Sequence, residues 1–269
     1  MRLRSGFSIP LALMAILTIS CSDKLQYSEK MKMRKTMIIA HRGASAFAKE
    51  NTIESFRKAI DLGADMIEID VRRTKDHILI VHHDELIKGK RVKELTYDEI
   101  FKMARDQGFS LATFEEVLKY TSEKIKLDIE LTEETYEKGV IELLSKYFKT
   151  DQYVITSFYD SCIRRIKDDH PDIKVGLILG ISKTKHPIRT RFSEFFPAKR
   201  CREAKADFLV ARRNLLWFGF LERAKRDNKP VFVYTVNDQK MIEKMLQDPR
   251  IDAIITDKPD LAIGLREKQ

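Results

Sequence analysis

Short apolar runs alternate with amphipathic segments through most of this 269-residue chain. Runs rich in Ile, Val and Leu are typical of buried strands, whereas apolar residues at helical spacing indicate helices with one packed face. The strand candidates are 37–40, 66–71, 78–81, 125–131, 153–157, 175–179, 208–211, 231–236 and 253–256, and helix candidates include 52–62, 133–148 and 216–227. This alternation predicts a parallel α/β fold.

The strand candidates number one more than the eight of a (β/α)8 TIM barrel, the fold that matches this chain length. Only residues 72–77 separate the second run from the third. A parallel crossover needs about a dozen residues or more. We therefore expect residues 78–81 to be an antiparallel extension at the barrel mouth, and the other eight runs to form a single-domain barrel.

The composition fits a soluble globular body, with 43% hydrophobic and 34% charged residues. The formal net charge is +9, and about +7 without the two arginines near the N-terminus. This charge favours anionic partners such as phosphate esters or lipid headgroups, although a solvated lysine-rich surface explains most of it. We expect neither a nucleic acid nor a protein partner.

The N-terminus resembles an export leader, because Arg2 and Arg4 precede an apolar stretch that ends at Cys21. This stretch is shorter than the roughly 20 residues that span a bilayer. Residues 1–21 are interpreted as a signal peptide with a lipoprotein-like cleavage site before Cys21, 22–35 as a polar tether, and 36–269 as the barrel domain. The protein would be a membrane-anchored bacterial lipoprotein facing the periplasm or exterior; an uncleaved anchor or ordinary secretion are the alternatives. Cys162 and Cys201 are expected to be single thiols, although an oxidising compartment would let them pair.

Polar groups gather where the predicted strands end, which is where barrel enzymes place their active residues. His41 and Arg42 follow the first run, and His83 follows the third. The acids Glu68 and Asp70 occupy alternate positions of the second run, so they share a face, and residues 128 and 130 repeat this spacing. Converging carboxylates form an oxygen site that suits Ca²⁺ or Mg²⁺ rather than zinc or copper.

Ordered motifs along the chain resemble the glycerophosphodiester phosphodiesterase family, whose fold is a (β/α)8 barrel. They are His-Arg-Gly at 41–43, Glu-Asn-Thr at 50–52, Glu-Ile-Asp at 68–70, His-Asp at 83–84, Asp-Ile-Glu-Leu at 128–131, Thr-Ser-Phe at 156–158, Tyr-Thr-Val-Asn-Asp at 234–238 and Ile-Thr-Asp-Lys-Pro-Asp at 255–260. The resemblance covers residues 37–264. It implies metal-dependent hydrolysis of glycerophosphodiesters to glycerol 3-phosphate and an alcohol.

The resemblance also implies roles for single residues. The catalytic histidines would be His41 as proton acceptor and His83 as donor, the metal ligands Glu68, Asp70 and Glu130, and the substrate-binding residues Arg42, Asn51, Thr132 and Tyr234. Arg42 would bind phosphate, while Asn51 would contact phosphate or, as we favour, hold the first loop. The nucleophile would be a hydroxyl of the substrate's own glycerol, giving a cyclic phosphate that water opens, or water itself.

Three positions depart from the family pattern. Lys49 stands where a proline usually precedes Glu-Asn-Thr, Tyr234 replaces a tryptophan, and Thr132 replaces a lysine after the third metal acid. Threonine can donate a hydrogen bond but carries no charge. In a less favoured register, Asp128 would be the metal ligand and Glu130 would take the place of the lysine.

Two further segments have open interpretations. The basic stretch at 183–202, with Phe192, Phe195 and Phe196, is a lid or lipid-facing surface, or a long loop packed on the barrel; we favour the loop slightly. Residues 215–220 are predicted to be helical core. His82 should point away from the site, because adjacent residues of an extended segment face opposite ways.

Two other functions compete with glycerophosphodiester hydrolysis. The same chemistry on lysophospholipids or another envelope phosphodiester is favoured if the loop at 182–202 offers an apolar lining. A catalytically weak binding lipoprotein is supported only by Thr132, and the intact histidines and acids argue against it.

Overall fold

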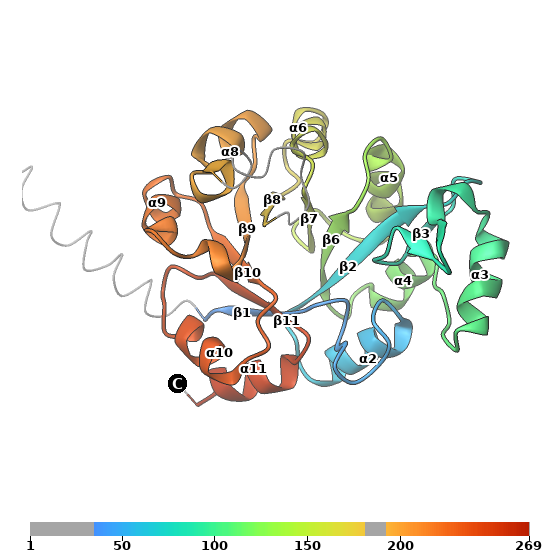
Figure 1. Cartoon of the computed structure of the whole chain (residues 1–269), viewed down its shortest axis with the longest axis horizontal. Helices are drawn as coiled ribbons and strands as arrows, with labels where there is room; N and C mark the ends of the chain where they lie inside the picture. Colours follow the sequence, from blue (N-terminus) through green and yellow to red (C-terminus); the bar gives the residue numbers. More distant parts are fainter. Residues whose placement is uncertain (1–34, 181–191, 269) are drawn as a thin grey trace, which may run out of the picture. The chain divides into compact units, whose positions relative to one another are not determined.

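The computed structural model in Figure 1 describes residues 35–180 and 192–268, and shows a closed parallel barrel. The strands follow one another in the order β1-β11-β10-β9-β8-β7-β6-β2, and pairing of β1 with β2 closes the circle. They are β1 Met37–Ala40, β2 Met66–Arg73, β6 Lys126–Leu131, β7 Tyr153–Ser157, β8 Val175–Leu179, β9 Phe208–Arg212, β10 Val231–Tyr234 and β11 Ala253–Thr256. The prediction of a single-domain (β/α)8 barrel is confirmed.

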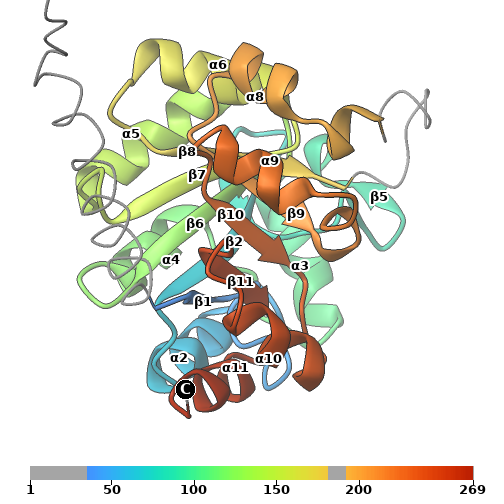
Figure 2. The ribbon, with the colours of Figure 1, turned by 90° about the vertical axis from the view of Figure 1, so that its left-hand side faces the viewer.

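Helices cover the outside of the barrel, as Figure 2 shows. They are α2 Ile53–Asp61, α4 Phe114–Thr121, α5 Glu137–Tyr147, α6 Asp160–Asp169, α8 Ala198–Ala204, α9 Phe220–Arg226, α10 Gln239–Leu246 and α11 Pro259–Arg266. Helix α2 begins where it does because two hydrogen bonds cap it. The Thr52 hydroxyl accepts from the Ser55 N–H, and the Ser55 hydroxyl accepts from the Thr52 N–H. The structure thus confirms the predicted alternation of strand and helix.

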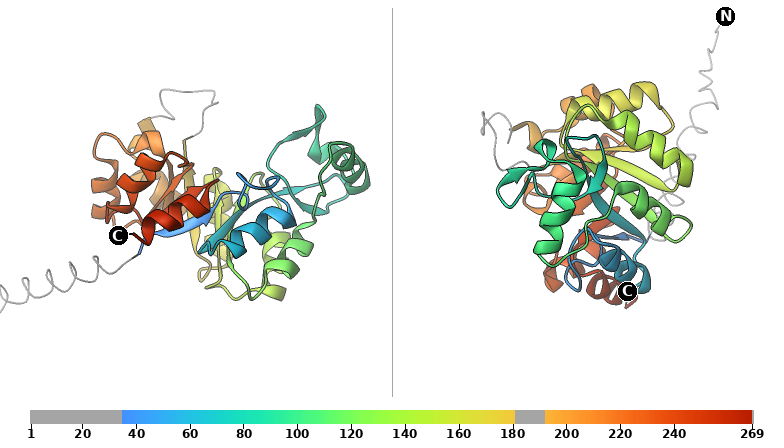
Figure 3. Two further views of the ribbon diagram at one scale, coloured as in Figure 1. Left: turned by 90° about the horizontal axis from the view of Figure 1, so that it is seen from below. Right: turned by 90° about the vertical axis from the view of Figure 1, so that its right-hand side faces the viewer.

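The extra run predicted at residues 78–81 begins an antiparallel excursion from the barrel mouth. Strand β3 (Leu79–Val81) pairs antiparallel with the end of β2, with Val71 opposite Val81. The strands β4 (Leu86–Ile87) and β5 (Lys90–Arg91), the 3-10 turn η1 (Val92–Glu94) and helix α3 (Tyr97–Asp106) complete the excursion. Figure 3 shows it standing out to one side of the barrel.

The core has two layers, one between strands and helices and one inside the barrel. Phe56, Phe114 and Phe220 are fully buried in the outer layer. The inner layer includes Phe208, whose ring fills the space beside Gly176: a Cβ there would lie 2.3 Å from the ring. Apolar contacts inside and outside the sheet hold the strand ends in place.

The prediction for residues 215–220 is wrong in part. Leu215 and Phe220 are buried, but the side chains of Trp217 and Phe218 are 67% and 81% exposed. Helix α9 begins only at Phe220, because Phe218 and the N-cap Gly219 adopt left-handed backbone angles, with φ of 57° and 71°. A residue with positive φ cannot continue a helix, so the segment before Phe220 loops outward.

The leader with Cys21, the tether and the basic residues at 183–191 lie outside the described residues. In the ranges 35–180 and 192–268, no helix has both the length and the hydropathy needed to cross a bilayer. Cys162 and Cys201 are buried and free, as expected.

Candidate active site

The inward-facing positions of the barrel change from apolar to charged toward the carboxyl ends of the strands. On β2, Met66 is followed at alternate positions by Glu68 and Asp70, and on β11 Ile255 lies two residues before Asp257. Since the strands are parallel, these charged ends meet at one mouth of the barrel. Toward the amino ends of the strands the barrel interior is filled by apolar side chains, so the polar groups face only the mouth.

His41 is held by an aspartate from the opposite end of the chain. Its Nδ1 lies 2.6 Å from Asp257 Oδ1, and Asp257 also accepts hydrogen bonds from Ser45 Oγ at 3.0 Å and from the Asn237 amide. Burial alone would raise the pKa of Asp257, but the His41, Asn237 and Ser45 contacts lower it to about 2. An ionised Asp257 holds the proton of His41 on Nδ1, which leaves Nε2 to accept a proton from a substrate.

Arg42 lies against three acids at a strained turn. Its φ is 55°, its N–H donates to Glu68 Oε2 at 2.8 Å, and its Nη1 donates to Glu50 Oε2 at 3.0 Å. Its Nε is 3.2 Å from Asp70 Oδ2. Burial would lower the pKa of Arg42, but the three carboxylates outweigh burial and raise it. The guanidinium is therefore a fixed positive charge at the mouth.

Glu68, Asp70 and Glu130 form a carboxylate cluster whose ligand oxygens all lie within 4.8 Å of one another. The pairing of β2 with β6 places Asp70 beside Glu130. Glu68 Oε1 and Asp70 Oδ1 are buried without a hydrogen-bond partner among the described residues. Burial and the neighbouring acids raise the pKa of both Glu68 and Glu130. Orphaned oxygens among crowded carboxylates fit a bound cation, which would satisfy both.

Asp128 lies outside the carboxylate cluster. Its Oδ1 accepts a hydrogen bond from Thr156 Oγ1 at 2.8 Å, and burial raises its pKa to about 7. The register with Glu130 as the third acid therefore fits the structure better than the alternative with Asp128.

Asn51 holds the first loop against β2. Its Nδ2 donates to Asp70 Oδ2 at 2.8 Å, its N–H donates to the Arg42 carbonyl at 3.0 Å, and the residue is 4% exposed. A buried amide that is already bonded to Asp70 supports the loop-holding role that we favoured over a phosphate contact.

His83 is directed toward His41 by the topology of β2. One edge of β2 pairs with β6 along Met66–Val71, and the other edge pairs with β1 at its start and with β3 at its end. Strand β3 pairs with the same edge of β2 as β1 does, but runs in the opposite direction. The chain at His83 therefore runs back toward the carboxyl end of β1, and His41 directly follows that end. The His82 N–H donates to the Asp70 carbonyl at 2.9 Å, so His83 reaches the level of the carboxylate cluster.

Arg72, which the sequence analysis did not single out, fixes this returning segment. Its Nε and Nη2 donate to the His83 carbonyl at 2.9 and 2.6 Å, and its Nη1 donates to Glu133 Oε1 at 2.9 Å. Arg72 lies two residues after Asp70, so the strand period that singled out the two acids could also have pointed to this position. The side chain of His83 is 40% exposed, with Nδ1 2.8 Å from Asp84 Oδ1.

The other candidate residues have mainly structural contacts. Thr132 Oγ1 donates to the Val71 carbonyl at 2.7 Å, and Tyr234 OH donates to the Leu179 carbonyl at 2.9 Å. Their roles toward a substrate stay predictions. His82 is half-buried and stacks on Phe109, with ring centroids 6.4 Å apart. This packing on Phe109 fits a structural role, and burial lowers the pKa of His82.

A carboxylate cluster beside a fixed guanidinium and two histidines suits the cleavage of phosphate esters, and the fold and site together indicate a barrel phosphodiesterase. Asp257 was quoted within a motif but given no role, because its partner His41 lies at the opposite end of the chain.

The chain belongs to the glycerophosphoryl diester phosphodiesterase family, which matches residues 41–261, and is thus a phosphoric diester hydrolase. The Bacillus subtilis protein YhdW is 32% identical over 247 residues, or 84% of this chain and 96% of that protein. The crystal structure of a glycerophosphodiester phosphodiesterase from Parabacteroides distasonis is similar with a TM-score of 0.74 and 24% identity, covering 87% of this chain and 98% of that one. An Oleispira antarctica phosphodiesterase solved with the product sn-glycerol 3-phosphate has a TM-score of 0.71 and 20% identity, covering 88% and 99%.

Proposed function

We propose that the protein hydrolyses glycerophosphodiesters to glycerol 3-phosphate and an alcohol, using His41 and His83 as acid/base groups and a divalent cation, Ca²⁺ or Mg²⁺. The observation that carries this proposal is the junction of the carboxylate cluster with Arg42 and His41 at one barrel mouth. Family membership supports the substrate class.

The chain's own residues supply the proton transfers. His41 Nε2 accepts the proton of the attacking hydroxyl, with Asp257 stabilising the imidazolium that forms. His83 donates a proton to the leaving alkoxide, because its segment returns to the level of Glu68 and Asp70. Glu68, Asp70 and Glu130 would hold the cation, which when bound would offset the charge on the phosphoryl oxygens. Arg42 would share that task as a fixed cation.

The test is hydrolysis of glycerophosphocholine, glycerophosphoethanolamine and lysophospholipids after chelation and after readdition of Ca²⁺ or Mg²⁺. We expect turnover of the water-soluble diesters only with a cation, and release of glycerol 3-phosphate. Full turnover after chelation would contradict the metal requirement. Faster turnover of lysophospholipids would favour the second candidate function, hydrolysis of lysophospholipids. The exposed aromatic residues near the mouth support that candidate.

We also propose that Cys21 carries lipid after cleavage of the leader, so that the barrel is exported and tethered to a membrane. The small residue Ser20 before Cys21, at the end of an apolar stretch, supports this. In cells, a Cys21→Ala variant should move to the soluble fraction. Unchanged retention in membranes of that variant, after a wash at high salt, would count against lipidation.

A further inference from the structure

Large exposed hydrophobic side chains gather on the catalytic face of the barrel. All eight in the described ranges follow the carboxyl end of a barrel strand: Phe47 after β1, Ile78 and Leu86 in the excursion after β2, Tyr159 after β7, Phe192 and Phe196 after β8, and Trp217 and Phe218 after β9. Single exposed apolar residues are common, but such a one-sided distribution marks an interaction surface.

The densest part is an aromatic rim of Phe192, Phe196, Trp217 and Phe218, with exposures of 67%, 46%, 67% and 81%. The rings of Phe192 and Phe196 are 4.9 Å apart. Arg223 from α9 ties the two contributing loops together. Its guanidinium lies 4.4 Å from the centre of the Phe196 ring and donates to backbone carbonyls of both loops. The rim is therefore held in place rather than formed on contact.

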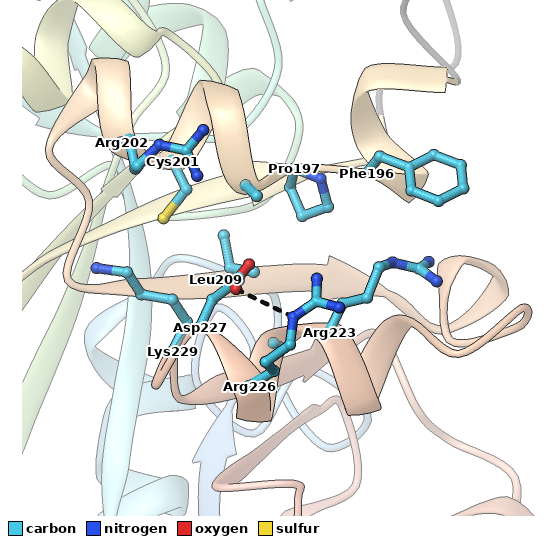
Figure 4. A pocket seen from close by; sticks show the side chains of 11 residues that line it. Phe196, Pro197, Cys201, Arg202, Leu209, Arg223, Arg226, Asp227 and Lys229 are labelled. Carbon is cyan, nitrogen blue, oxygen red and sulfur yellow. Dashed lines mark ion pairs between the residues drawn. The ribbon is translucent and has the colours of Figure 1, made fainter.

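A basic cleft begins beside the aromatic rim and runs between α8 and α9 along the outside of the barrel, toward the turn that precedes β10 (Figure 4). Its volume is about 300 Å³, and Phe196 belongs to both features. The charged side chains that line it are Arg202, Arg223, Arg226, Lys229 and Asp227. The one acid lies 3.5 Å from Arg226 Nε, so positive charge remains in excess. Arg223 holds the cleft against the rim, since its guanidinium stacks on Phe196.

We propose that the aromatic rim and the basic cleft dock the α8–α9 side of the barrel on an anionic phospholipid bilayer, with the rim at the catalytic end of that side. Aromatic rings partition into the headgroup region while cations attract anionic lipids. The segment from 192 to 229 that carries both features has ten Lys and Arg residues against five Asp and Glu. Self-association through this face would bring two basic clefts together, which their repulsion opposes. This inference is independent of the chemistry at the carboxylate cluster.

The chain contains a single tryptophan, and it is Trp217 in the aromatic rim. Its fluorescence therefore reports directly on docking. A protein of residues 22–269 removes any lipid on Cys21, and residues 36–269 form one compact unit with the whole barrel. With phosphatidylcholine vesicles that contain phosphatidylglycerol, we expect a blue shift of the emission and quenching by brominated acyl chains. Emission that stays unchanged with these vesicles would overturn the proposal.

A charge-matched pair of double variants tests the basic cleft. Arg202→Glu with Arg226→Glu should weaken binding to anionic vesicles about tenfold or more. Arg57→Glu with Lys58→Glu changes the charge equally on exposed α2 positions, and should bind nearly as the parent does. Equal binding by both variants would contradict docking through the cleft.

Phe218→Ser keeps Trp217 as a probe and should weaken vesicle binding without changing hydrolysis of glycerophosphocholine. A concentration-dependent dimer that Phe218→Ser abolishes would instead assign the rim to a second copy of the chain. Vesicle binding tests the docking proposal, and hydrolysis of the soluble substrate tests the proposed chemistry. Either proposal can fail while the other holds, so the two outcomes are distinguishable.

Discussion

At the scale of single residues, His41, His82 and His83 have different environments. Nδ1 of His41 is fixed by Asp257, His83 is partly exposed at the mouth, and His82 stacks on Phe109. Replacement of His41 or His83 by alanine should lower kcat by about 10²–10⁴, the usual contribution of a general acid or base. His82→Ala is the control. We expect its kcat to fall much less, and an equal loss in all three variants would point to a folding defect.

Arg72 and Arg73 provide a second matched pair. Arg72 donates twice to the His83 carbonyl, whereas Arg73 Nη1 reaches the Thr135 carbonyl away from the site. If His83 is the proton donor as proposed, Arg72→Met should lower kcat about tenfold or more with a smaller change in KM, because His83 would be displaced. Arg72→Met should also shift the limb of the kcat–pH profile that reflects the protonation of the proton donor.

Arg73→Met should leave kcat and the pH profile near those of the parent. If Arg72→Met changed thermal stability alone and kept the parent's pH profile, its role would be structural.

Asp257 links the site to acid stability. Its folded pKa of about 2 lies below the ordinary value of 3.8. The folded state therefore favours the ionised form, and the stabilisation is complete above the ordinary value and lost as the pH falls through the folded pKa. After allowance for its partial exposure it contributes about 1–2 kcal/mol.

Urea unfolding at neutral pH should show Asp257→Asn to be less stable than the parent by this amount, and the difference should shrink near pH 2. A difference that stays constant with pH would show that the aspartate acts by shape rather than by charge.

The sequence singled out the candidate residues next to strand ends, since their spacing and motif are local, and the fold brings several of them together at one mouth of the barrel. It did not assign Asp257 to His41 or Arg72 to His83, because these contacts depend on how the barrel closes and how β3 returns. The side-chain contacts of Thr132 and Tyr234 with backbone carbonyls also require the folded register.

At the scale of elements, the turn after β1 depends on Gly43. Its φ is +82°, and a Cβ there would lie 2.4 Å from Ser55 Oγ and 2.7 Å from the Ser55 backbone. Gly63 has a similar φ of +78° with nothing within 4 Å of a Cβ. Gly63→Ala should therefore cost only the conformational strain, about 1 kcal/mol, whereas Gly43→Ala should cost about 3 kcal/mol or more because the α2 backbone must move.

Chemical denaturation of both glycine variants separates the two costs. Equal losses of unfolding free energy would show that the turn can relax away from Ser55.

The strands were predicted to within a few residues because their apolar runs are short and bounded by polar residues. The start of α9 was wrong, since apolar Trp217 and Phe218 extend the helical pattern beyond Gly219, where the backbone leaves the helix. Hydrophobicity indicated core there, but these side chains are exposed on the catalytic face.

At the scale of the whole molecule, barrel closure gathers acids that lie far apart in the sequence. Glu68 and Asp70 come from β2 and Glu130 from β6, and their raised pKa values reflect burial together with mutual repulsion. Without a cation, this crowding opposes the closed barrel. With a cation, the same carboxylates stabilise it, since binding to the folded state alone adds about 2.7 kcal/mol when the cation is at 100 times its Kd.

Ca²⁺ or Mg²⁺ should therefore raise the Tm of the parent by several degrees, about 5–10 °C at that saturation. Glu130→Gln should have a higher Tm than the parent after chelation, because it removes a crowded charge, and should lose most of the cation's effect. Asp128→Asn is the control: it leaves the cluster intact, so the shift with cation should persist. If the cation raised the Tm of Glu130→Gln but not that of Asp128→Asn, the third ligand would be Asp128 and not Glu130.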